Sequence, residues 1–148
     1  MYRNLRITLH FKRRINMFDA RQRVLSNGIK LITIKKDTQL AAFHAAINIG
    51  ALYENNNERG ISHFIEHMLF KGTMSRSNKK LNMDLENLGG EYNAYTDNTS
   101  TVYSVTSLRE ELEKSVDIIS DMLMNSIFPP KEIEKEREVI LSEIRSSR

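Results

Sequence analysis

Residues 24–50 carry the apolar patterns of strands. The stretch "VLSNGIKLITIKK" has an Asn-Gly pair between two apolar runs, which is the strongest short-range signal of a β-hairpin. We therefore expect two strands joined by a tight turn over residues 24–36. The following run, "AAFHAAINIG", is largely apolar and ends in glycine. It predicts a strand that is buried on both faces.

The period changes after the polar loop "ENNNERG". From Ile61 onward, apolar residues occupy positions 61, 64, 65, 68 and 69. This i, i+3, i+4, i+7, i+8 spacing predicts a helix over residues 61–70 with one buried apolar stripe. Gly72 follows as a helix stop.

The second half of the chain alternates between helical and strand patterns. "KKLNMDLENLGG" predicts a helix that ends at a glycine pair, and "EYNAYT" and "STVYSVTSL" are typical of strands because they are rich in aromatic and β-branched residues. Apolar residues at 108, 112, 116, 119 and 123 predict a long helix. Pro129-Pro130 ends it and opens a last helix, "KEIEKEREVILSEIRSS".

The order of these elements indicates the fold class. The chain has 148 residues, which is enough for one domain with a real core. Strands that come early and in hairpins, with helices gathered later, favour an α+β fold over a doubly wound parallel sheet. We expect a two-layer sandwich of a mainly antiparallel sheet packed by helices.

The positive net charge comes from one end of the chain. Five of the 22 basic residues and none of the 19 acidic ones lie in residues 1–16, so the rest carries 17 basic against 19 acidic side chains. No basic stripe points to a nucleic-acid groove, and we expect no nucleic-acid partner. The domain prediction is a basic leader or disordered tail over 1–16, with translation from Met17 as one explanation, followed by the folded part over 17–148.

Composition also limits chemistry and location. The chain has no cysteine, which excludes disulfides, a thiolate nucleophile and cysteine-based zinc sites. No apolar stretch approaches the roughly 18 residues that a membrane span needs, and the leader lacks the apolar segment of a secretory signal. We expect no membrane partner and a cytoplasmic protein. The alternative is the mitochondrial matrix, because the leader is rich in arginine and free of acids, although it lacks the serine of transit segments.

Two histidines and a glutamate stand out in "HFIEH". On the helix predicted from Ile61, His63, Glu66 and His67 lie opposite the apolar stripe, and residues i and i+4 stack so that both imidazoles can reach one point. The order H-x-x-E-H is the inverted zincin motif, with two zinc ligands and a base for the attacking water. The competing interpretation is a solvated polar face. Phe70 within that face, and the absence of lysine from it, argue against this interpretation.

A catalytic zinc ion takes three protein ligands and keeps one position open. The last helix offers Glu136 and Glu143, which share a face with apolar residues there. A carboxylate on such a face is costly unless a cation compensates it. Without the histidine pair, a solvated surface would be the better interpretation of either glutamate. With the pair, both become candidate ligands.

The chain resembles the pitrilysin (insulinase-like) family of inverzincin zinc metallopeptidases. The likeness covers residues 24–148 and rests on "NGIKLITIKKD", "ERGISHFIEHMLFKGT", "GGEYNAYTDNTSTVYS" and "EREVILSEI". The resemblance implies zinc as the cofactor, His63 and His67 as ligands and Glu66 as the general base. It also makes Glu143, 76 residues after the second histidine, the third ligand.

The resemblance implies further roles. Glu136 matches an acidic position that supports the metal site, and Asn93 and Ala94 match an edge strand that pairs with an extended peptide substrate. Family members are several hundred residues long, so residues 17–148 are expected to form the N-terminal part of a catalytic domain. The expected partner is a downstream domain or a homologous subunit. The resulting prediction is a zinc-dependent endopeptidase, and its rival is a non-catalytic peptide-binding subunit or inactive fragment.

Overall fold

A computed structural model describes residues 19–146 of the protein. The chain divides between Asp37 and Thr38 into two compact units, a boundary that the sequence patterns did not predict. The expected leader, residues 1–16, lies outside the described part. No helix within the described residues is both long and apolar enough to span a bilayer.

The first unit contains the predicted hairpin. Strand β1 (Asp19–Val24) pairs antiparallel with β2 (Lys30–Lys35). Gly28 has a φ of 87° in the turn, a left-handed conformation that glycine adopts without strain. The Asn27 side chain accepts a hydrogen bond from the backbone N–H of Ile29 (3.2 Å). The hairpin prediction is confirmed, although the first strand begins five residues earlier than expected.

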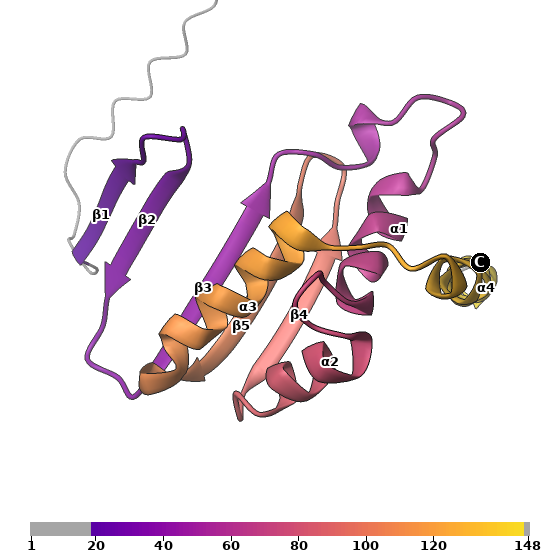
Figure 1. Cartoon of the computed structure of the whole chain (residues 1–148). Coiled ribbons are helices and arrows are strands. Elements are labelled where there is room, and N and C mark those ends of the chain that lie inside the picture. Colours follow the sequence, from indigo (N-terminus) through magenta and orange to yellow (C-terminus); the bar gives the residue numbers. More distant parts are fainter. Residues whose placement is uncertain (1–18, 147–148) are drawn as a thin grey trace, which may run out of the picture. The chain divides into compact units, whose positions relative to one another are not determined.

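The second unit is built on a three-stranded antiparallel sheet (Figure 1). Its strands are β3 (Leu40–Ile47), β4 (Glu91–Thr96) and β5 (Thr101–Leu108), in the spatial order β3-β5-β4. The helices are α1 (Ile61–Met68), α2 (Asn78–Glu86), α3 (Leu112–Asn125) and α4 (Pro130–Ser146). Short 3₁₀ turns are η1 (Ala51–Tyr53), η2 (Leu69–Lys71) and η3 (Arg109–Glu111). This arrangement confirms the predicted α+β class with a mainly antiparallel sheet packed by helices.

The core lies between the sheet and the helices, and α3 crosses β3 and β5 in Figure 1. It consists of apolar side chains from β5, α2, α3, η2 and the turn after α2: Leu69, Leu81, Leu85, Leu88, Tyr103, Val105, Ile118, Ile119 and Met122. Gly90 enters β4 so close to β5 that a Cβ there would lie 1.8 Å from the Thr106 carbonyl oxygen. Close backbone approach therefore requires glycine at the start of β4.

Strand β3 corrects one prediction. Its residues alternate between exposed and half-buried, so the expectation of burial on both faces is wrong. Phe43, Ala45 and Ile47 pack against the core, whereas His44 on the other face is exposed. The reason is that an antiparallel sheet can be stabilised by helices on one face alone. Apolar run length could not distinguish this case from a fully buried strand.

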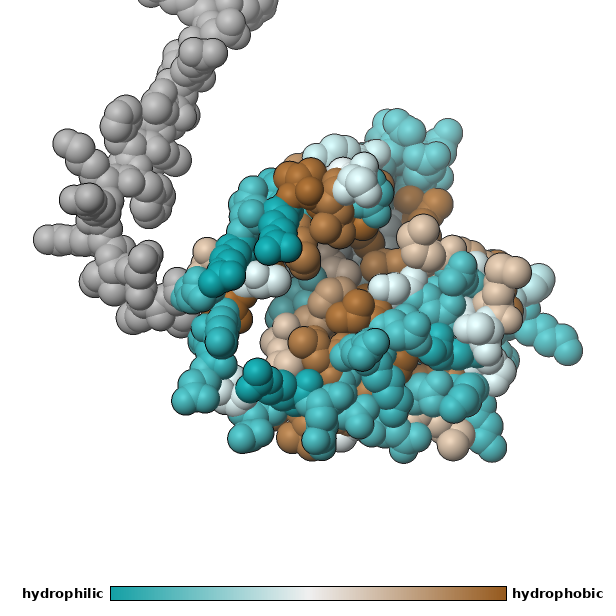
Figure 2. Space-filling model, turned by 60° about the vertical axis from the view of Figure 1, so that its left-hand side comes forward, coloured by the Kyte–Doolittle hydropathy of each residue, from teal (hydrophilic) through white to brown (hydrophobic). Residues whose placement is uncertain are grey.

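The apolar stripe of α1 is only partly buried. Met68 and Leu69 are in the interior, but Ile61 is 45% exposed and Ile65 is 40% exposed. Glu66, on the side expected to be polar, is only 8% exposed. The prediction of one buried apolar face is therefore wrong, because α1 turns part of its polar face toward β4 and α4. Apolar side chains (brown) reach the surface among hydrophilic ones (teal) on the face shown in Figure 2.

Two boundaries also differ from the sequence patterns. Leu108 ends β5, and the long helix α3 starts only at Leu112. The helical spacing of Leu108 and Leu112 was therefore misleading. Leu108 belongs to β5, where it pairs with Leu40, and only Leu112 belongs to the helix. The last helix starts at Pro130, as the proline pair predicted.

A backbone junction ties the segment after α1 to the segment before α4. Thr73 forms an isolated antiparallel bridge with Ser126. The N–H of Ile127 donates to the Gly72 carbonyl (3.3 Å), and the N–H of Met74 donates to the Asn125 carbonyl (2.9 Å). We call residues 72–77 together with 121–127 the α1–α4 junction. It connects the segment that follows η2 to the end of α3 and to the segment that leads into α4.

Asp121 is the hub of this junction. Its carboxylate accepts hydrogen bonds from Thr73 Oγ1 (2.6 Å), Ser75 Oγ (2.7 Å) and Asn125 Nδ2 (2.9 Å), and it pairs with Arg76. Burial of the carboxyl raises its pKa, but these hydrogen bonds outweigh burial and hold the pKa of Asp121 well below its ordinary range. The ionised carboxylate therefore fixes the junction over a wide range of pH.

Candidate metal centre

Three predicted ligands come together at the contact of α1 and α4. His63 and His67 lie one turn apart on α1, and their Nε2 atoms are 3.1 Å apart. Glu143 approaches from α4, with its Oε2 atom 3.7 Å from His63 Nε2 and 3.6 Å from His67 Nε2. One atom from each side chain lies within 4.8 Å of the other two. The grouping joins residues that are 76 positions apart in the sequence.

The spacing of these atoms fits a tetrahedral metal ion. Zinc binds nitrogen and oxygen ligands at about 2.0 to 2.2 Å, so two ligands at a tetrahedral angle are about 3.3 to 3.5 Å apart. The three separations of 3.1, 3.6 and 3.7 Å bracket that value. Two imidazoles and a carboxylate are also a ligand set that zinc takes in catalytic sites. The residues present therefore fit the ion that the sequence predicts.

Glu136 contacts His67 at Nδ1, the ring nitrogen that does not face Glu143 and His63. Its Oε2 atom lies 3.1 Å from His67 Nδ1, and its Oε1 atom lies 2.6 Å from Lys71 Nζ. The residue is 6% exposed. When Nδ1 of His67 donates to this carboxylate, the lone pair of Nε2 points to the common centre. Of the two glutamates predicted on α4, Glu143 reaches that centre and Glu136 lies one step behind it.

Glu66 lies between α1 and the sheet. Its Oε2 atom accepts a hydrogen bond from Thr96 Oγ1 on β4 (2.6 Å). Burial, together with the Glu66 charge, raises the pKa of the Tyr103 phenol above its ordinary value, so the phenol stays protonated beside the carboxylate. The hydroxyl of Thr96 gives Glu66 a fixed orientation, as a group that handles protons needs.

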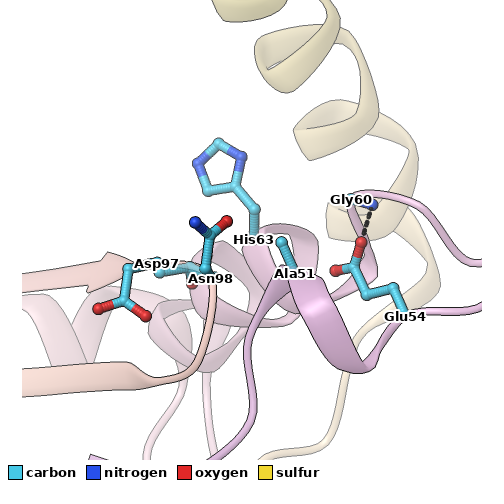
Figure 3. A pocket seen from close by; sticks show the side chains of 7 residues that line it. Ala51, Glu54, Gly60, His63, Asp97 and Asn98 are labelled. Atoms are coloured by element: carbon cyan, nitrogen blue, oxygen red, sulfur yellow. Dashed lines mark hydrogen bonds between the residues drawn. The ribbon is translucent and has the colours of Figure 1, made fainter.

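A shallow hollow of about 450 Å³ adjoins the centre (Figure 3). It is lined by Ala51, Glu54, Gly60, His63, Thr96, Asp97 and Asn98. The Glu54 carboxylate accepts hydrogen bonds from the N–H groups of Gly60 (2.7 Å) and Ser62 (2.9 Å). It therefore satisfies free donors at the start of α1. Asp97 does the same for the turn after β4, where it accepts from the N–H groups of Thr99 and Ser100 (both 2.7 Å).

The predicted substrate residues lie on β4. Asn93 is exposed and Ala94 is half-buried. Among the strands that the structure describes, β4 pairs only with β5, so it forms an edge of its sheet. The N–H of Ala94 donates to the Asn93 side-chain oxygen (2.9 Å). An edge strand of this kind can accept an extended peptide.

Sequence reasoning missed three residues at this site. Lys71 lies four residues after His67 and just beyond the helix predicted over residues 61–70, so helical spacing could have indicated it. Thr96 lies two residues after Ala94 on the same face of the strand, which is a weaker signal. Glu54 lies in a polar loop, where no pattern in the sequence distinguished it.

The model of the insulinase family, peptidase family M16, matches residues 30–148. A protein named "uncharacterized zinc protease" from Rickettsia felis is 41% identical over 124 residues, which are 83% of this chain and 30% of that protein. The mitochondrial-processing peptidase subunit beta of Caenorhabditis elegans is 42% identical over 120 residues, which are 81% of this chain and 26% of that protein.

Solved structures share the fold. A protease from Helicobacter pylori superposes with a TM-score of 0.83 at 23% identity, over 87% of this chain and 31% of that one. The chain therefore spans about a third or less of the proteins that it matches.

Proposed function

Because the chain belongs to the insulinase family of peptidases, peptidase family M16, we propose that it provides the zinc site of an endopeptidase. Residues 17–148 form part of the catalytic domain in this proposal. The observation that carries it is the convergence of His63, His67 and Glu143 from two helices on one point. Helix packing alone gives no reason for three such groups to meet, whereas a shared cation does.

The roles of the chain's own residues follow from their surroundings. A zinc ion at this centre supplies Lewis-acid chemistry, acidifying a water molecule and polarising the carbonyl of the scissile peptide bond. His63, His67 and Glu143 hold the ion, and Glu136 orients His67 through Nδ1. Glu66 accepts the proton of the attacking water and passes it to the leaving amine. The Thr96 hydroxyl keeps Glu66 aimed during this exchange.

The substrate in this proposal is an extended peptide or an unfolded protein segment. It adds to the free edge of β4 beside Asn93 and Ala94, where backbone hydrogen bonds give affinity with little dependence on side chains. The hollow next to His63 then receives part of the substrate.

Partner and compartment are also proposals. One relative is named as a subunit, which supports a homologous subunit or a further domain as the partner of this chain. The relatives include a mitochondrial subunit and bacterial proteins. The cytoplasm, with the mitochondrial matrix as the alternative, therefore stays a prediction.

The test measures zinc content and zinc affinity of the purified full chain. We expect one zinc ion per wild-type chain and a large loss of zinc in His67→Ala. His44→Ala is the matched control, because His44 is an exposed histidine on β3 and should leave zinc unchanged. Equal zinc in all three chains would refute the metal site. Chelator-sensitive cleavage of an unstructured peptide by an assembly that contains the chain would then distinguish an enzyme from a peptide-binding subunit.

A further inference from the structure

Lys71 contacts Glu136, which in turn contacts the predicted metal ligand His67. It closes η2, four residues after His67. Its Nζ atom lies 2.6 Å from Glu136 Oε1, and the other oxygen of that carboxylate lies 3.1 Å from His67 Nδ1. The Lys71 side chain is 22% exposed, so most of its length is covered. The three residues come from η2, α4 and α1, and Glu136 joins them.

The burial of Glu136 explains why this contact matters. At 6% exposure, the carboxylate has lost most of its hydration, which is costly unless a cation and hydrogen bonds compensate it. Lys71 supplies the cation to one oxygen. The second oxygen then remains aligned with His67 Nδ1. Without the Lys71 ammonium group, we expect the Glu136 carboxylate to rotate toward solvent or toward another hydrogen-bond donor.

We propose that Lys71 is a positioning residue for the metal centre: it fixes Glu136 so that this carboxylate holds His67 with its Nε2 lone pair directed at the ion. This inference rests on the proposed function, because it assumes that His67 is a ligand. Lys71 touches neither metal nor substrate. It acts on affinity through the orientation of His67, as partners behind a ligand do in other metal sites.

A simpler explanation is that the Lys71–Glu136 pair only anchors η2 to α4. Both explanations predict some loss of stability when Lys71 is removed, so stability cannot separate them. They differ at the His67 ring. If Lys71 acts through Glu136, its removal changes the tautomer of His67 and weakens zinc binding, and both effects require Glu136. If it is only an anchor, neither quantity changes in the folded chain.

The experiment is a double-mutant cycle on zinc affinity. The full chain is compared as wild type, Lys71→Met, Glu136→Gln and the double variant, each checked for native structure by circular dichroism. Zinc affinity is measured by competition with a chromogenic chelator. The matched control is Lys135→Met, which removes an exposed lysine from a Lys–Glu pair on α4. Ring ¹⁵N shifts of His67 in the zinc-free chain report its tautomer.

We expect Lys71→Met to weaken zinc binding by about tenfold, at the lower end of the range for partners behind a ligand. Lys71→Arg, which keeps the charge, should stay within about threefold of wild type, and Lys135→Met should match wild type. In the Glu136→Gln background, Lys71→Met should have no further weakening effect. In the Lys71→Met single variant, the ring ¹⁵N shifts of His67 should move from those of an Nδ1–H tautomer toward those of a mixture of tautomers.

Three results would overturn the inference. They are wild-type affinity in a folded Lys71→Met chain, an equal loss in the presence and absence of Glu136, and unchanged His67 shifts. If Lys71→Met does not fold, Lys71→Leu takes its place, because leucine also removes the donor for Glu136, and the same three results apply. A wild-type chain that binds no zinc would instead refute the proposed function on which the inference rests.

Discussion

At the scale of single residues, the carboxylates of Glu66 and Glu143 differ in their surroundings. Glu66 is buried beside β4 and held by the Thr96 hydroxyl. The Glu143 side chain is 48% exposed, and it faces both histidine Nε2 atoms. A carboxylate that faces two imine nitrogens is placed to bind a metal, whereas one fixed by a hydroxyl is placed to handle a proton. The two residues should therefore respond differently to the same substitution.

We predict that Glu66→Gln retains zinc and Glu143→Gln does not. Glutamine preserves the shape of either side chain but removes its charge and its basicity. Glu66→Gln should lower kcat by about 10²-fold or more, since general-base catalysis contributes about 10² to 10⁴, at unchanged zinc content. Glu143→Gln should weaken zinc binding by more than about tenfold. Metal analysis and peptide cleavage, measured on an active assembly, check both. Zinc release by Glu66→Gln alone would reverse the two roles.

The individual residues show what sequence could and could not predict. Motif order and helical spacing predicted His63 and His67, and the family resemblance selected Glu143 over Glu136. The structure brings these three side chains together. Lys71 and Thr96 were missed because each contacts a partner that is distant in sequence. Glu136 lies 65 residues after Lys71 and Glu66 lies 30 residues before Thr96, and only the folded structure brings each pair together.

At the scale of elements, the site depends on how α1 and α4 are held relative to each other. The α1–α4 junction makes this connection through backbone bonds around Thr73 and Ser126. Asp121 satisfies the polar groups of the junction, and Arg76 links the same carboxylate to α2 through Asp84. A buried carboxylate with this many donors is costly to remove.

We predict that Asp121→Asn lowers the free energy of unfolding by about 2 to 3 kcal/mol. Asp117→Asn is the matched control. Asp117 pairs with the same arginine, but its side chain is exposed, so its loss should cost less than about 1 kcal/mol. Urea unfolding followed by circular dichroism measures both values. Equal losses in the two variants would contradict the assignment of Asp121 as the hub.

The lowered pKa of Asp121 predicts that the free energy of unfolding depends on pH. The pKa of folded Asp121 lies below its unfolded value, which is near 3.9. Its stabilising contribution is therefore fully present above the unfolded pKa and is lost as pH falls through the folded pKa. The stability difference between wild type and Asp121→Asn should be constant near neutral pH and should shrink on acidification below about pH 4. A difference that grew toward acid would contradict this sign.

The elements were predicted unequally well. The hairpin at Asn27-Gly28 and the helix opening at Pro130 were predictable, because backbone preferences of these residues act locally. The burial of β3 and the apolar stripe of α1 were not. Both depend on which faces neighbouring elements cover, and an apolar run or spacing does not contain that information.

At the scale of the whole molecule, a bound metal should stabilise the fold. Zinc would join α1 to α4, and the unfolded chain lacks this preformed set of ligands. At a free zinc concentration of 100 times Kd, the linkage amounts to about 2.7 kcal/mol. For a domain of this size, we expect a rise in Tm of about 10 °C. Thermal unfolding with zinc and with a chelator measures it. His63→Ala should show no such rise, and an equal rise in that variant would contradict the prediction.

Exposed apolar side chains predict self-association of the full chain. Val139 and Leu141 on α4, Leu52 on η1 and Met124 on α3 are all exposed. Exposed apolar surface marks contacts with other proteins where it is contiguous. The apparent mass from light scattering should therefore increase with concentration, and Leu141→Gln should reduce the increase. A constant monomer mass up to about 100 μM would contradict this prediction, since a Kd of that size corresponds to an association free energy of only about −5.5 kcal/mol.

The most direct test of the central claim is X-ray absorption at the zinc edge on the zinc-loaded full chain. If His63, His67 and Glu143 hold the ion, the spectrum should fit two imidazoles and oxygen ligands at about 2.0 to 2.1 Å. The His67→Ala chain should lose one imidazole from the fit or fail to retain zinc. A spectrum with oxygen ligands alone, or one that is identical in wild type and His67→Ala, would contradict the account.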